Sequence, residues 1–84
     1  MVIEQFRGAA LAPVGERFRL RGRMLPEDVS YHASWMALSG DRCFQLMEAP
    51  SLKSLQGWMS QWDDLVAFDV VTVVESSEFW RQRD

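Results

Sequence analysis

The segment from Tyr31 to Glu48 constrains the fold of this chain more than any other segment. Each of its halves alternates apolar and polar side chains, and the turn sequence Ser39-Gly40-Asp41 lies between them. Alternation with a period of two is typical of a β-strand, and two such runs around a glycine-containing turn predict a hairpin. We therefore expect neighbouring antiparallel strands over residues 29–38 and 42–48.

The segment before the hairpin predicts a strand and a helix. Residues 1–6 are rich in strand formers. In the helix that follows, Pro13 suits the first turn, where a missing N–H costs nothing, and Pro26 marks the end. We attribute Gly22, inside this helix, to close packing on the sheet.

The segment after the hairpin predicts a second helix and a last strand. Ser51 is a suitable N-cap, and apolar residues then recur every three or four positions from Leu52 to Leu65. Residues 66–75 are mostly β-branched, which predicts a buried strand. Residues 76–84 form a C-terminal tail with a short helical piece.

The order strand, helix, strand, strand, helix, strand predicts one ferredoxin-like domain over residues 1–84, an α+β fold with a four-stranded antiparallel sheet. In this topology the strands lie in the order fourth, first, third, second. Both helices cover one face of the sheet, so the other face is open in a monomer.

Strand alternation divides the side chains between the two faces of the sheet. We assign to the helix-covered face Ile3, Tyr31, Ala33, Trp35, Phe44, Leu46, Phe68 and Val70. We assign to the open face Val2, Glu4, Phe6, Ser30, His32, Ser34, Met36, Cys43, Gln45, Met47, Ala67, Asp69, Val71 and Val73. We expect Trp35, Trp58 and Trp62 in the core. Because the open set is neither fully polar nor fully apolar, we expect a homodimer through this face.

Composition excludes several classes of function. A net charge of −3 disfavours nucleic acid as a partner, and the arginines between positions 17 and 23 are interpreted as a solvated helix face. One cysteine and one histidine cannot build a closed metal site, so no metal is expected. No run approaches the roughly 20 apolar residues that span a bilayer. With an unpaired cysteine and no leader pattern, a cytoplasmic protein without membrane contact is expected.

Several motifs point to one family. The segments Pro13–Phe18, Arg21–Pro26, Asp41–Glu48 and Trp62–Val66, with Trp58, resemble the family catalogued as domain of unknown function 3303. The resemblance implies a dimeric α/β barrel, in which two ferredoxin-like subunits join their sheets around a shared interior. It transfers no catalytic residue. Haem-degrading members of the wider superfamily carry an iron-binding histidine on the second helix; this chain has none there, and no cofactor is expected.

The predicted open face contains a candidate site. Asp69, Glu4, Gln45 and His32 would form a polar row, and the apolar walls would come from Phe6, Met36, Met47 and Val71. Of these residues, His32, Glu4 and Asp69 are the catalytic candidates, because neighbouring carboxyl groups raise each other's proton affinity and histidine titrates near neutral pH. The proposed ligand-binding residues are Phe6, His32, Met36, Gln45, Met47 and Val71.

Three functions fit this site. The first is a dimer that binds a small apolar or amphipathic molecule in the barrel interior. The second is a cofactor-independent monooxygenase or isomerase that acts on a phenolic or polyketide-like substrate. The third is a structural dimer with a filled barrel. The sequence leaves open whether the protein is an enzyme.

Overall fold

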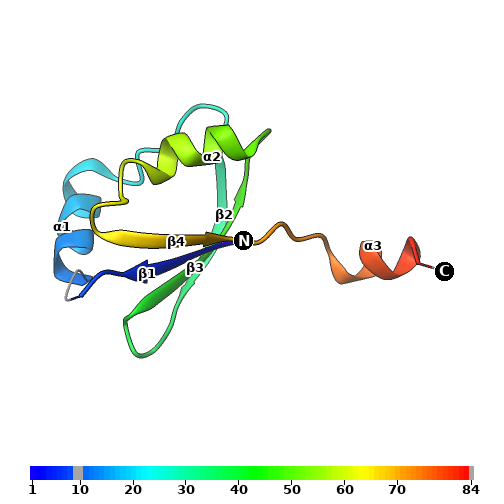
Figure 1. The fold of residues 1–84 in the computed structure, drawn as a ribbon, viewed down its shortest axis with the longest axis horizontal. Helices are drawn as coiled ribbons and strands as arrows, with labels where there is room; N and C mark the ends of the chain where they lie inside the picture. Colours follow the sequence, from blue (N-terminus) through cyan, green and yellow to red (C-terminus); the bar gives the residue numbers. More distant parts are fainter. Residues whose placement is uncertain (9–10, 84) are drawn as a thin grey trace.

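The strands of the protein form one antiparallel sheet in the order β2-β3-β1-β4. The structure is a computed structural model that describes residues 1–8 and 11–83. Helices α1 and α2 lie on one side of the sheet (Figure 1). Along the chain the elements are β1 (Val2–Phe6), α1 (Leu11–Arg21), β2 (Ser30–Met36), β3 (Arg42–Glu48), α2 (Leu52–Met59), β4 (Val66–Val70) and α3 (Ser76–Arg81). The predicted α+β ferredoxin-like fold, including its strand order, is confirmed.

Helix α1 ends earlier than the sequence predicted. Gly22 follows its last residue with a φ of 67°, and its N–H donates a 2.7 Å hydrogen bond to the carbonyl of Phe18. This left-handed conformation closes a helix and is cheapest for glycine. No heavy atom lies within 4 Å of where a Cβ at Gly22 would be. The predicted close packing of Gly22 and the predicted helix end at Pro26 are therefore both wrong.

Helix α2 begins as predicted but is shorter. The Ser51 side chain accepts a 3.2 Å hydrogen bond from the backbone N–H of Ser54, which confirms the N-cap. The helix ends at Met59, and residues 60–65 continue as turns in which the N–H of Trp62 donates to the carbonyl of Met59 at 2.9 Å. These turns preserve the three-residue spacing of the apolar side chains, so Trp62 is still buried.

The core lies between α2 and the sheet. Trp58 is 1% exposed, and its ring meets that of Phe68 edge-on at a centroid distance of 5.6 Å. The prediction that Trp58 and Trp62 belong to the core is confirmed. The buried cluster consists of Val2, Val29, Leu55, Trp58, Trp62 and Val66.

The two faces of the sheet are largely exchanged relative to the prediction. Glu4, Cys43 and Gln45, assigned to the open face, are buried on the helix-covered face, together with Val2. Trp35, assigned to the core, is 54% exposed on the other face. The assignment was therefore wrong for Ile3, Ala33, Trp35, Phe44 and Leu46 and for their counterparts Val2, Glu4, Phe6, Ser34, Met36, Cys43, Gln45 and Met47.

A bulge in β2 and the end of β4 account for the remaining differences. The register shifts between Tyr31 and Ala33, which lets Tyr31 stay on the helix-covered side while Ala33 lies on the open face. Strand β4 ends at Val70 rather than at residue 75. The chain then leads away from the sheet to α3, whose Trp80 is 64% exposed (Figure 1).

Candidate functional site

A cavity of about 420 Å³ lies between α1 and the helix-covered face of the sheet. It exists because α1 buries none of its side chains, whereas α2 packs closely through its tryptophan. The apolar lining comprises Phe6, Leu11, Val14, Phe18, Met36, Trp58 and Trp62. The polar lining comprises Glu4, Arg23, Ser34, Cys43 and Gln45. An apolar hollow with a few convergent polar groups is the usual form of a small-molecule site.

Glu4 is the acidic group of this cavity. It lies in the middle of the central strand β1, opposite Cys43 on one side and Phe68 on the other, and is 6% exposed. Burial raises the pKa of its carboxyl, while hydrogen bonds from Gln45 and Cys43 and the charge of Arg23 partly oppose the shift. Glu4 therefore keeps its proton to a higher pH than an exposed glutamate does.

Gln45 and Cys43 come from β3 and support Glu4 from the neighbouring strand. Gln45 is 6% exposed, and its Oε1 has no hydrogen-bond partner among the described residues. Desolvation, together with the charge of Glu4, raises the pKa of the Cys43 thiol to about 11. Cys43 therefore stays a protonated thiol at neutral pH.

Arg23 is the cation of the cavity. Its carbonyl accepts hydrogen bonds from the indole nitrogens of Trp58, at 2.9 Å, and Trp62, at 3.2 Å. Its guanidinium carbon lies 3.6 Å from the ring centroid of Tyr31 and 5.0 Å from that of Phe18. Within residues 1–8 and 11–83, Arg23 forms no ion pair with a carboxylate. The two indole hydrogen bonds thus fix the backbone of Arg23, and the two aromatic rings position its guanidinium.

Sequence reasoning missed Arg23 as a site residue, since it was grouped with the arginines of a solvated helix face. Its position directly after Gly22 was the available signal, because a glycine that ends α1 removes Arg23 from the helix. A second arginine with a structural role is Arg17, whose side chain extends from α1 to the turn that follows α2.

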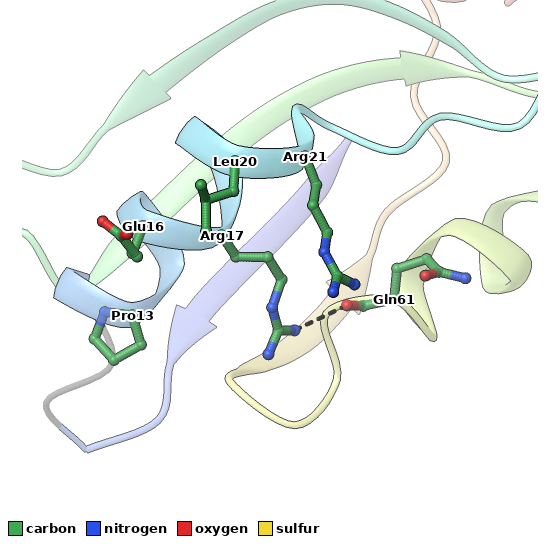
Figure 2. Close-up of a pocket in the computed structure, with 6 residues that line it drawn as sticks. All are labelled: Pro13, Glu16, Arg17, Leu20, Arg21 and Gln61. Carbon is green, nitrogen blue, oxygen red and sulfur yellow. Dashed lines mark hydrogen bonds between the residues drawn. The ribbon is translucent and has the colours of Figure 1, made fainter.

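Arg17 attaches α1 to the turn that follows α2. Its guanidinium forms two 2.7 Å hydrogen bonds with the carboxylate of Asp64. It also donates a 3.0 Å hydrogen bond to the carbonyl of Gln61, which Figure 2 shows in a pocket separate from this cavity. The same guanidinium lies 5.6 Å from the ring centroid of Trp62. The bond from Arg17 lowers the pKa of Asp64. Arg17 is therefore a structural clamp beside the cavity rather than part of its lining.

The structure brings together some of the predicted site residues. Glu4, Gln45, Phe6 and Met36 all line the cavity. Met47 and Val71 instead line a separate depression of about 240 Å³ at one end of the sheet. The predicted apolar wall is therefore divided between two hollows.

The predicted polar row does not form. Asp69 is exposed and lies opposite Ile3 on the open face, so it cannot raise the proton affinity of Glu4 on the covered face. His32 is 48% exposed at its side chain, and its Nε2 lies 3.0 Å from Oε1 of Glu48. Neither His32 nor Asp69 reaches the cavity, and Glu4 is the one catalytic candidate that does.

Two structural observations concern metals and membranes. Among the residues that the structure describes, no three histidine, cysteine or acidic side chains come together as a metal site would require. Over the same residues, no helix combines the length and the apolarity needed to cross a bilayer.

Comparison with known protein families identifies the family of the chain. The family model described as "Domain of unknown function (DUF3303)" matches residues 1–81, which confirms the resemblance seen in the sequence. No curated protein and no solved structure is detectably similar to the chain.

Proposed function

This chain belongs to the DUF3303 family, and we propose that it binds a small amphipathic molecule in the cavity between α1 and the sheet. The observation that carries the proposal is the placement of a buried carboxyl, Glu4, and a cation, Arg23, in one apolar hollow; over residues 1–8 and 11–83 this cation has no ion-pair partner. Charged groups in such surroundings are costly unless they meet polar partners. A ligand with a polar head and an apolar body supplies both kinds of contact.

The proposed site lies inside each subunit rather than in the interior of a dimeric barrel, where the sequence had placed it. The size of the cavity falls within the range of small-molecule sites, about 300–1,000 Å³. A barrel interior filled by side chains would leave this hollow open, because the hollow lies on the opposite side of the sheet.

We propose in addition that the open face of the sheet forms a homodimer. This face carries Trp35, Phe44, Leu46 and Ile3, and Trp35 is more than half exposed in the single chain. A contiguous apolar surface of this kind is typical of a subunit interface. The buried, unpaired Cys43 fits a reducing compartment such as the cytoplasm.

Filling the cavity tests the proposed binding site. Gly15 lies on α1 in the lining, and a Cβ there would meet no heavy atom within 4 Å. We expect Gly15→Leu to weaken the binding of 1-anilinonaphthalene-8-sulfonate, an amphipathic dye, at least tenfold in a fluorescence titration. Gly57→Leu on α2 is the matched control, because Gly57 is equally free of neighbours and lies outside the lining. Equal affinity of both variants and the wild type would place binding elsewhere.

A further inference from the structure

We propose that Glu4 and Arg23 act together on a small carbonyl compound, with Glu4 as the base that moves a proton and Arg23 as the cation that holds the oxygen. This inference rests on the proposed function, since it concerns the ligand of the same cavity. The class of ligand it names is an aromatic 2-oxo acid that can convert between its keto and enol forms.

The base is assigned from position and burial. Among the residues that the structure describes, Glu4 is the only carboxylate in the cavity lining, and it is 6% exposed on β1, an inner strand of the sheet. The pKa of Glu4 is raised from its ordinary value toward neutral pH. Its ionised carboxylate is therefore a stronger base and a better acceptor of a proton from carbon than an exposed glutamate. Cys43 and Gln45 line the same cavity from the neighbouring strand β3, and Cys43 lies directly opposite Glu4.

Arg23 is assigned as the cation that binds the ligand because it forms no ion pair with a carboxylate of the described residues. Both indole nitrogens of the cavity wall fix the backbone of Arg23, and Tyr31 and Phe18 flank its guanidinium. Glu4 and Arg23 line the same cavity without forming an ion pair. A guanidinium binds two adjacent oxygens well, and the carboxylate and carbonyl of a 2-oxo acid provide them.

The apolar lining selects the rest of the ligand. Phe6, Trp58 and Trp62 line the same cavity as the polar pair and give it an aromatic wall. Aromatic side chains favour a flat, aromatic partner, through stacked or edge-on contacts.

The reaction is an isomerisation that needs no oxidant or reductant. The Glu4 carboxylate removes a proton from the carbon next to the carbonyl, and the electron pair of that C–H bond forms a C=C bond. The carbonyl π electrons move to oxygen, where Arg23 stabilises the negative charge. Glu4 then returns the proton to this oxygen to give the enol, and the reverse sequence restores the ketone.

Deuterium exchange into phenylpyruvate tests this proposal. We expect the protein in deuterium oxide to accelerate exchange at the methylene group, as followed by proton NMR. Glu4→Gln keeps a side chain of the same shape and should reduce the acceleration roughly 100-fold while leaving phenylpyruvate bound. Binding is measured separately, by the tryptophan fluorescence of the cavity wall. Glu27→Gln, which removes an exposed carboxylate of the loop after α1 that does not line the cavity, should match the wild type.

A pH profile and an Arg23 variant test whether Glu4 and Arg23 act on the ligand or only stabilise the fold. The exchange rate should rise as Glu4 loses its proton, and Glu4→Gln should abolish this rise. Among the described residues, the other ionisable groups of the lining are Arg23 and Cys43, and the pKa of the Cys43 thiol is raised to about 11. Arg23→Met should weaken phenylpyruvate binding at least tenfold.

The results of these experiments distinguish failure of the proposed isomerase activity from failure of the proposed binding function. Phenylpyruvate binding with an exchange rate unaffected by Glu4→Gln would overturn the proton-transfer role and leave the cavity as a binding site. Dye binding that Gly15→Leu weakens, with no phenylpyruvate binding, would overturn the ligand class alone. Loss of the difference between Gly15→Leu and Gly57→Leu would overturn the proposed function itself.

Discussion

The indole of Trp58 donates a 2.9 Å hydrogen bond to the carbonyl of Arg23, a residue 35 positions earlier in the chain. Trp58 is almost fully buried under the sheet, so this bond links the core to the wall of the cavity. The loop after α1, with Gly22 and Met24 both at positive φ, thereby takes a fixed path. Packing of the core and placement of the cationic side chain therefore depend on the same tryptophan.

Replacing this tryptophan should reduce stability. Trp58→Phe removes the hydrogen bond to Arg23 and leaves unfilled volume in the core, and we expect a loss of roughly 2 kcal/mol or more in the free energy of unfolding. Urea denaturation measures this loss. Trp80→Phe, in the exposed part of α3, should change stability by less than about 0.5 kcal/mol. Similar values for the two variants would contradict the role of Trp58.

The buried carboxyl of Glu4 should make stability depend on pH. Its pKa is raised in the folded state above the ordinary value of 4.5, so the folded protein holds this proton more tightly than the unfolded chain does. The contribution of Glu4 to stability is therefore complete below about pH 4.5 and is lost as the pH rises through the folded pKa.

Comparison with Glu4→Gln isolates this effect. The variant should gain stability relative to the wild type as the pH rises, in urea denaturation between pH 4 and pH 8. Glu27→Gln, the same change at an exposed loop position, serves as the control and should match the wild type at each pH. A difference between Glu4→Gln and the wild type that does not vary with pH would contradict the buried, titrating carboxyl.

Replacing Gly22, which follows α1, and Gly57, which lies inside α2, by alanine should change the stability of the protein in opposite directions. Gly22→Ala forces a Cβ into the left-handed region at a φ of 67° and should cost about 1 kcal/mol of stability. Gly57→Ala lies within α2, where alanine favours the helix, and should gain up to about 1 kcal/mol. Thermal unfolding of both variants provides the measurement. Stabilisation by Gly22→Ala would show that α1 does not end at this residue.

The open face of the sheet should control the oligomeric state. Light scattering after size exclusion should give about twice the chain mass of 9.7 kDa for the wild type. Trp35→Glu introduces a charge into the proposed interface and should give a monomer. Leu38→Glu is the control, because Leu38 lies fully exposed in the hairpin turn. A monomeric wild type at micromolar concentration would contradict the dimer.

The hairpin and the order of the elements could be predicted because they depend on local pattern. Strand β3 has the predicted bounds, Arg42–Glu48, and the Ser51 cap begins α2 where expected. Alternation states which side chains share a face within a strand. It does not state which face the helices cover when both faces mix polar and apolar residues.

The location of the site could not be predicted without knowing which face of the sheet the helices cover. The apolar Trp35 and Phe44 looked like core residues, whereas the polar Glu4 and Gln45 looked like surface residues. The structure places the polar pair under the helices because a cavity, not a packed core, lies beneath α1. A cavity of this kind leaves no local pattern, since it results from α1 and the sheet together.

The clamp at Arg17 has a consequence for how ligands enter. Helix α1 has no buried side chain, and its two bonds to Asp64 join partly exposed charges. Dissolved ions weaken attraction between exposed charges much more than they weaken apolar contacts. The rate at which a ligand enters and leaves beneath α1 should therefore increase with ionic strength, even where the core itself is unaffected.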